Sequence, residues 1–133
     1  MGAPTFLDLV HVLRTHRSLI EQYGGIDGLR EDGLLHSAIA MPQSSFGGQF
    51  LHLDLFEMAA AYLYHIVQNH PFIDGNKRTG AATAIIFLAM NDIEIEADED
   101  GLIELTLSVA RGESKKREIV DFFRARARPQ SAD

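Results

Sequence analysis

The chain of 133 residues contains no cysteine and only four prolines. Without cysteine there can be neither a disulfide framework nor a thiolate metal site. The first residues lack the charged and apolar stretches of a secretory signal peptide. The apolar runs farther along are interrupted by polar residues and are too short to span a bilayer. We therefore expect a cytoplasmic protein that does not interact with membranes.

Positive charge is also scarce. Twelve Lys and Arg residues stand against 19 Asp and Glu residues, which gives a net charge of −7. Because phosphate backbones are held mainly by Lys and Arg, this balance argues against a nucleic-acid-binding protein. Arg124, Arg126 and Arg128 form a short basic run near the C-terminus. We interpret it as a solvated helix end, where cations suit the helix dipole.

The rest of the composition, 46% apolar and 23% charged, is that of an ordinary globular protein, and the length fits a single domain over 1–133. The apolar spacing is helical almost throughout. It predicts an all-α fold, a compact bundle of about six helices, with a loose tail from about residue 128. The predicted helices cover residues 5–23 (with Thr5 as the N-cap), 32–41, 55–69, 76–91, 100–110 and 114–126.

Two of these helices, 55–69 and 76–91, are apolar on nearly all sides, which is typical of buried helices. Asp54, followed three residues later by Glu57, resembles a capping box at the start of the first. Before it, residues 42–52 are rich in Gly and Ser and predict a small flap or hairpin. The residues of interest in this flap are Phe46, Gly47, Gly48 and Phe50. Its apolar side chains can either dock on the core or contact a partner.

The loop between the two buried helices, residues 70–80, is the most polar stretch of the chain. Pro71 ends the first helix, and Asp74-Gly75 begins the second. The first N–H groups of a helix have no partner within it, so they form a ready anion site with the helix dipole. Lys77 and Arg78 add positive charge at that end of the helix, where it is unfavourable unless an anion binds.

Several residues of this loop have both a structural and a chemical interpretation. His70 can be a helix C-cap or a base that takes a proton from a hydroxyl. Asp74 can be an N-cap or a ligand of a Mg2+ ion that bridges phosphates. Asn76 can be a capping residue or a phosphate donor, whereas Phe72 is most simply a core anchor for the loop. A metallohydrolase site built on His36, His65 and His70 is disfavoured, because the last two do not share a helix face.

The loop, which reads H-P-F-I-D-G-N-K-R from His70 to Arg78, resembles the motif of the Fic family and, more closely, its Doc branch of toxins from toxin–antitoxin pairs. Further matching segments are Tyr23-Gly-Gly25, Gly28-Leu-Arg30, Asp54-Leu-Phe-Glu57, and Phe87-Leu88 with Asn91. The resemblance implies a helical bundle in which the flap at 42–52 positions the target. It also implies a base at His70, a Mg2+ residue at Asp74, a structural role for Pro71 and Phe72, and a phosphate cradle formed by Gly75, Asn76, Lys77 and Arg78.

Two departures from the family pattern decide which reaction the resemblance implies. AMP-transferring members usually carry glycine where this chain has Lys77, and a second arginine where it has Ala81. The Doc branch is thought to bind ATP reversed, so that the γ-phosphate meets the target hydroxyl. The implied function is therefore an ATP- and Mg2+-dependent protein kinase that modifies elongation factor Tu on a threonine and arrests translation. An AMP transferase and a catalytically silent binding module remain the alternatives.

The sequence also lacks the inhibitory pattern that many Fic proteins carry, in which a Glu pairs with the second arginine. Only Ser114 has a Glu four residues later, Glu118, and the arginine partner is replaced by Ala81. The resemblance therefore implies that a separate antitoxin restrains the chain.

Overall fold

A computed structural model describes residues 3–129 of the chain. In chain order its elements are α1 (Leu9–Tyr23), α2 (Asp32–Ala40), the short 3-10 helix η1 (Met41–Gln43), β1 (Ser45–Phe46), β2 (Gln49–Phe50), α3 (Leu55–Asn69), α4 (Asn76–Met90), β3 (Ile93–Ile95), α5 (Glu99–Ala110), α6 (Lys116–Arg126) and β4 (Ala127–Pro129). The prediction of an all-α bundle of about six helices is confirmed. None of the helices in the described range is both long and apolar enough to cross a bilayer.

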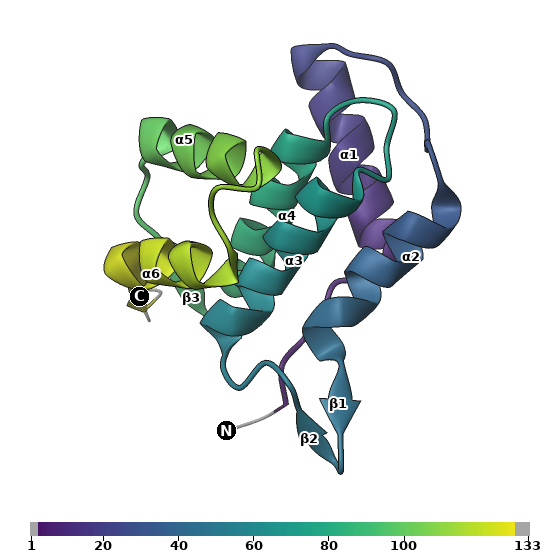
Figure 1. The fold of residues 1–133 in the computed structure, drawn as a ribbon. Helices are drawn as coiled ribbons and strands as arrows, with labels where there is room; N and C mark the ends of the chain where they lie inside the picture. The colour runs from purple at the N-terminus through teal and green to yellow at the C-terminus, as the bar shows by residue number, and fades with distance from the viewer. Residues whose placement is uncertain (1–2, 130–133) are drawn as a thin grey trace.

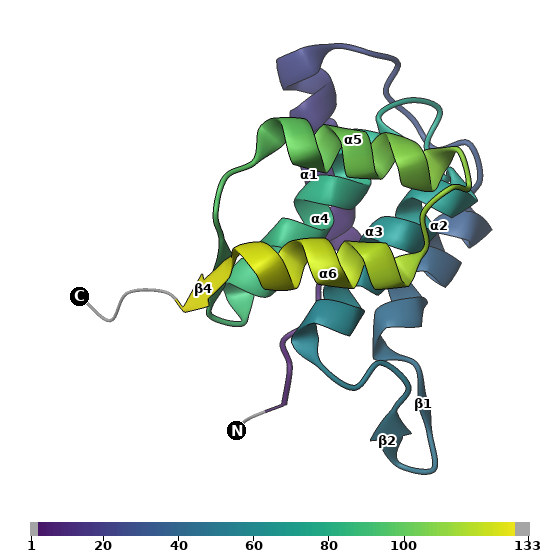
Figure 2. The same cartoon turned by 60° about the vertical axis from the view of Figure 1, so that its left-hand side comes forward.

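The centre of the bundle is the pair α3 and α4, which lie side by side (Figure 1). Helices α1 and α2 cover one side of this pair, and α5 and α6 cover the other (Figures 1 and 2). The core contains most of the apolar residues of α3, together with Phe72, Phe87 and Phe123. Helix α3 is buried along most of its length, as its lack of a polar face predicted. The same prediction is only partly correct for α4, which buries one face and leaves Ile86 and Met90 36% and 40% exposed.

Helix α1 begins later than the sequence predicted. Asp8, not Thr5, is the N-cap, and its carboxylate accepts a hydrogen bond from the N–H of His11. The backbone of Thr5 is held instead by the side-chain amide of Asn91. Leu7 is buried, and the hydroxyl of Tyr62 bonds to both its N–H and its carbonyl. These tertiary contacts keep residues 5–7 out of the helix.

The predicted cap at Asp54 is confirmed, because its side chain accepts from the N–H of Glu57 at 2.8 Å. The reciprocal bond that would complete a capping box is not formed within the described residues, since the side chain of Glu57 does not bond to the N–H of Asp54. The end of the chain differs from the prediction. Arg128 and Pro129 belong to β4, which pairs antiparallel with β3. The predicted loose tail therefore does not include these two residues, and residues 130–133 lie outside the described part. Strands of three residues give too short a pattern to be recognised in the sequence.

The close approach of α3 and α4 depends on Gly80. A Cβ atom at this position would lie 2.9 Å from Cγ2 of Val67 and 3.2 Å from the carbonyl oxygen of Leu63. We expect Gly80→Ala to lower the free energy of unfolding by about 1–3 kcal/mol, because the two central helices must move apart. Denaturant unfolding of the purified variant measures this loss.

Gly33 provides the matched control. It lies within α2 at a negative φ angle, and an added Cβ would meet nothing within 4 Å. Gly33→Ala should therefore be neutral or stabilising by up to about 1 kcal/mol, because alanine loses less backbone entropy in a helix. Equal effects of the two substitutions would contradict the assigned packing role of Gly80.

Candidate functional site

The loop predicted as the site joins α3 to α4 at one end of the bundle (Figure 1). His70 is the C-cap of α3, with a left-handed backbone at φ 51° and its N–H bonded to the carbonyl of Ile66. Its side chain is exposed, and its imidazole has no hydrogen-bond partner among residues 3–129. The capping function thus rests on the backbone of His70, while its imidazole stays available for chemistry.

A segment after α1 holds this end of α3. Nε of Arg30 donates to the carbonyl of His70 at 2.7 Å, and its Nη2 donates to the carbonyl of Asn69 at 2.9 Å. The backbone N–H groups of Arg30 and Glu31 both donate to the carbonyl of Pro71. A charged guanidinium is a strong donor, and here it satisfies two of the carbonyls that a helix end leaves unpaired.

Phe72 anchors the loop in the core and is 1% exposed. The side chain of Asn76 is buried beside it. It accepts from the N–H of Phe72 at 2.9 Å and donates to the carbonyl of the same residue at 3.0 Å. Because both ends of this amide are occupied, the side chain of Asn76 fixes the loop. If Asn76 binds phosphate, as predicted, it would do so through its backbone N–H. This role stays a prediction.

Asp74 lies at the exposed side of the loop. Its Oδ1 accepts from the N–H of Gly75 at 3.0 Å, and its Oδ2 accepts from the N–H of Ile26 at 3.3 Å. Gly25 lies so close that an added Cβ would approach Oδ2 to 2.9 Å. The carboxylate is thus oriented by two backbone donors, and it retains unused lone pairs toward solvent.

The N-terminus of α4 has no side-chain cap. Its N-cap is Gly75, at φ 81°, and no acidic residue occupies the first turn. Among the described residues, nothing accepts from the N–H groups of residues 76–78. Lys77 is exposed and has no ion-pair partner within residues 3–129, while the guanidinium of Arg78 lies 4.3 Å from the ring centre of Tyr23. Free N–H groups and an unpaired lysine form a site suited to an anion.

Two contributors to this site, Arg30 and His16, were not identified from the sequence as site residues. Nε2 of His16 lies 2.8 Å from the carbonyl oxygen of Asp74, and the imidazole stacks on Phe72. Arg30 was noted only as part of a matching segment. Both residues reach the loop across long chain separations, so no local pattern could reveal their contacts. The one available signal was Arg30 itself, within a Gly-rich stretch that matched the family.

The flap lies away from this loop. Strands β1 and β2 form a hairpin with Gly47 and Gly48 at its turn, and both glycines have positive φ angles. Phe46 is 83% exposed, whereas Phe50 contacts Phe6 edge to face. The hairpin precedes α3 and the loop follows it, so the two lie at opposite ends of this helix (Figures 1 and 2). Target docking by the flap stays a prediction, and it requires a target that extends along α3.

No group of three or more His, Asp or Glu side chains in residues 3–129 is arranged to hold a metal ion. The disfavoured metallohydrolase reading therefore gains no support. His36 pairs with Asp32 on the surface of α2, far in sequence from the loop. In the loop itself, Asp74 is the acidic residue available to a metal ion.

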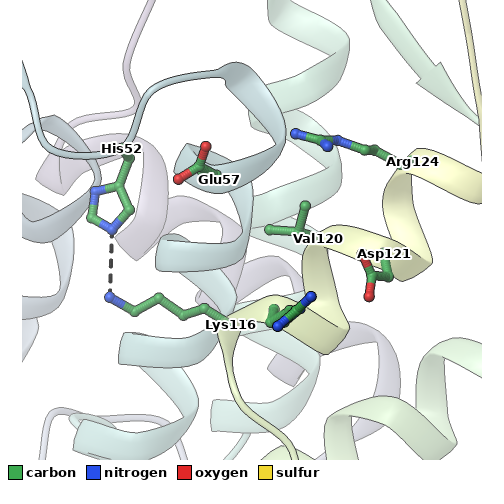
Figure 3. Close-up of a pocket in the computed structure, with 7 residues that line it drawn as sticks. His52, Glu57, Lys116, Val120, Asp121 and Arg124 are labelled. Carbon is green, nitrogen blue, oxygen red and sulfur yellow. Dashed lines mark hydrogen bonds between the residues drawn. The ribbon is translucent and has the colours of Figure 1, made fainter.

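A hollow of about 420 Å³ lies between the start of α3 and α6 (Figure 3). Its lining includes His52, Glu57, Lys116 and Arg124, and Nζ of Lys116 lies 3.4 Å from Nε2 of His52. Burial and the neighbouring Lys116 lower the pKa of His52, and burial lowers the pKa of Lys116. A neutral imidazole therefore accepts from the ammonium group. The motif loop is at the other end of α3, so this hollow is separate from the candidate site.

His65, near this hollow, should make stability depend on pH. Burial, and then Lys116 and His52, lower the pKa of His65 from 6.5 to about 4. As pH falls from about 6.5 to about 4, the unfolded chain binds a proton that the folded chain does not bind. The difference between these two pKa values corresponds to about 3 kcal/mol. Because the ring is only partly buried, solvent screening should reduce this, and we expect the free energy of unfolding to decrease by on the order of 2 kcal/mol across this window through His65 alone.

Urea unfolding at a series of pH values measures this decrease. His65→Gln should flatten the curve between pH 6.5 and 4 relative to the wild-type protein. The control is His36→Gln, because His36 is exposed and pairs with Asp32. A pH dependence that is the same with and without His65 would show that this ring is not held neutral in the folded protein.

Comparison with known proteins shows which family the chain belongs to. Residues 6–88 match the family model described as Fic/DOC family. "Protein kinase doc" of Escherichia phage P1 is 32% identical over 113 residues, which cover 85% of this chain and 88% of that protein. "Toxin Doc" of Mycolicibacterium smegmatis is 41% identical over 78 residues, covering 59% of this chain and 60% of that protein. The matched range includes α1, the Arg30 segment and the whole motif loop, so the chain belongs to the Fic/DOC family.

Proposed function

We propose that the chain is a Doc-like toxin, a protein kinase that transfers the γ-phosphoryl group of ATP to a hydroxyl of a translation factor. The observation that carries this proposal is the uncapped N-terminus of α4, with Lys77 unpaired among the described residues, beside the exposed imidazole of His70. The name of the phage P1 relative, "Protein kinase doc", supports phosphoryl transfer as the reaction.

In the proposed reaction the hydroxyl oxygen of the target attacks the γ-phosphorus. A new P–O bond forms, the bond to the oxygen that bridges to the β-phosphate breaks, and ADP leaves. His70 takes the proton of the attacking hydroxyl, as an imidazole can near neutral pH. The N–H groups at the start of α4, with Lys77 and Arg78, hold the phosphates and stabilise their charge.

The donor set of the loop fits Mg2+ as part of the substrate complex. Mg2+ is usually bound through one or two carboxylates together with substrate phosphates. Asp74 supplies one carboxylate, and its two backbone hydrogen bonds leave lone pairs free. We propose Asp74 as the residue that holds Mg2+, whose bound charge would offset that of the phosphate oxygens.

Elongation factor Tu, modified on a threonine, is the target that we propose from the family resemblance, and arrested translation is the expected consequence. A separate antitoxin is the restraint that we propose. The carboxylate of Glu118 accepts from the N–H of Lys115 at the start of α6, and residue 81 is alanine. An internal Glu–Arg brake of the Fic type is therefore not assembled from these residues.

The test of phosphoryl transfer uses ATP labelled at either end. The chain is incubated with Mg2+, elongation factor Tu, and ATP carrying label in the γ- or in the α-phosphate. We expect label from the γ-position only. Label from the α-position would instead establish an AMP transferase, and in that case Lys77→Gly should raise the activity. Absence of label with both substrates, together with harmless expression in bacteria, would favour a silent binding module.

A further inference from the structure

His16 of α1 is almost completely buried, with 2% of its side chain exposed, directly beneath the motif loop. Its imidazole stacks on Phe72, with ring centres 3.7 Å apart and planes at 5°. A buried histidine is often a simple core residue. This one has a second set of contacts, because its ring also lies against the backbone of Asp74 and Gly75.

The contact with Asp74 determines which nitrogen of His16 carries a proton. Nε2 lies 2.8 Å from the carbonyl oxygen of Asp74. A carbonyl oxygen can only accept, so Nε2 is the donor. The other nitrogen, Nδ1, faces Oδ1 of the half-exposed Asp27 at 3.8 Å. His16 therefore fixes the direction of one backbone carbonyl in the loop.

That carbonyl belongs to the peptide bond between Asp74 and Gly75. A trans peptide is planar, with its C=O and N–H pointing in opposite directions. Because the carbonyl is held toward α1, the N–H of Gly75 points away from α1. There it donates to Oδ1 of the Asp74 carboxylate at 3.0 Å. The imidazole of His16 thus acts on the orientation of the carboxylate through one rigid peptide plane.

The Asp74–Gly75 peptide needs an external contact to fix its orientation, because its second residue is glycine. Glycine adopts positive and negative φ angles about equally well, so rotation of the Asp74–Gly75 peptide costs little intrinsically. Rotation would turn the carbonyl toward the anion site and remove the N–H from the carboxylate. An added Cβ at Gly75 would lie 3.5 Å from Nε2 of His16 and 3.2 Å from Cδ1 of Ile20, so α1 closes this side of the loop.

We propose that His16 is a positioning residue for phosphate and metal binding, which holds the Asp74–Gly75 peptide in the orientation that presents the Asp74 carboxylate and the N-terminus of α4 to the ligand. This inference rests on the proposed function of the loop. His16 itself contacts no reacting atom.

Two substitutions separate the roles of the ring and the proton donor. His16→Phe keeps the stack on Phe72 and removes the N–H. His16→Gln removes the ring and keeps an amide donor. If His16 positions the peptide, His16→Gln should retain more function than His16→Phe. If His16 only fills the core, the order should be reversed, because phenylalanine preserves the aromatic packing.

Asn91→Ala is the control for lost stability. It removes side-chain hydrogen bonds to Thr5 and Phe87 at the far end of α4, and it leaves the loop untouched. Denaturant unfolding gives the stability of all variants. Calorimetry gives their affinity for the non-hydrolysable analogue AMP-PNP with Mg2+, and the γ-label assay gives the rate of transfer.

We expect His16→Phe to weaken Mg2+–AMP-PNP binding and to slow transfer by about ten-fold or more, since small displacements of a positioned group have large effects. His16→Gln and Asn91→Ala should stay within about three-fold of the wild-type affinity. Equal affinity of His16→Phe and the wild-type protein would overturn the proposal. If His16→Phe does not fold, a ten-fold loss in folded His16→Gln would overturn it instead.

The two readouts also separate this proposal from the proposed function. A wild-type protein that binds Mg2+–AMP-PNP without transferring phosphate would refute the kinase function, while the affinity comparison would still decide the role of His16. A wild-type protein that does not bind the nucleotide would overturn both.

Discussion

Replacement of His70 by asparagine should lower the rate of phosphoryl transfer by about 10²–10⁴-fold, the usual range for loss of a general base. The imidazole is exposed and has no hydrogen-bond partner among the described residues. Asparagine tolerates the left-handed backbone at φ 51° better than most residues, so the fold should be preserved. Initial rates of γ-label transfer and a thermal unfolding curve measure the two effects.

His11→Asn is the control for this prediction, because His11 is an exposed histidine on α1 that pairs with Asp8. We expect it to leave the transfer rate unchanged. In bacteria, expression of the wild-type chain should arrest growth, and expression of His70→Asn should not. A His70→Asn protein as active as the His11→Asn control would exclude His70 as the base.

Arg30→Ala should reduce transfer by about 10- to 100-fold, although Arg30 lies outside the motif. Its guanidinium bonds to the carbonyls of His70 and Asn69, and so it holds the end of α3 that carries the proposed base. Without these bonds the strained backbone of His70 loses part of its support. The same substitution should lower the free energy of unfolding by only about 1–2 kcal/mol, because the side chain is exposed.

A comparison of kcat with the KM for ATP distinguishes positioning from simple destabilisation. Arg30→Ala should lower kcat more than it changes KM, since the first turn of α4, the proposed phosphate site, is left intact. Arg17→Ala, which removes an exposed arginine paired with Glu21, is the matched control and should change neither parameter. If Arg30→Ala loses activity only in proportion to its unfolded fraction, the hydrogen bonds of Arg30 to His70 and Asn69 have no role in transfer beyond stability.

The parts of the fold that the sequence predicted correctly depend on local patterns. The central position of α3 was evident because this helix lacks a polar face. The same pattern in α4 predicted too much burial, since Ile86 and Met90 are exposed. The cap at Asp54 was evident because an acidic side chain stands just before an apolar helix. The start of α1 was placed too early, because the contacts of Leu7 and Thr5 with Tyr62 and Asn91 lie far apart in the chain. The β3–β4 pair was missed, because its strands have only three residues each and β4 also contains part of the basic run.

In the candidate site, too, local features were predicted and long-range contacts were not. The anion-binding character of the loop was predicted from its charges and its place before a helix. The structure places Lys77 and Arg78 in the first turn of α4 and Phe72 in the core. The sequence could not show that the side chain of Asn76 is bonded to the backbone of Phe72. It also could not show that His16, in α1, and Arg30, in the segment after α1, hold the loop through hydrogen bonds. Such contacts join residues that only the folded chain brings together.

The most direct test of the proposed phosphoryl transfer is the mass of elongation factor Tu after incubation with the chain, ATP and Mg2+, with His70→Asn as the parallel control. The mass should rise by one phosphoryl group, on a threonine, with the wild-type chain only. A rise by one AMP group, or a target left unmodified by a wild-type chain that arrests growth, would contradict a kinase acting on this factor.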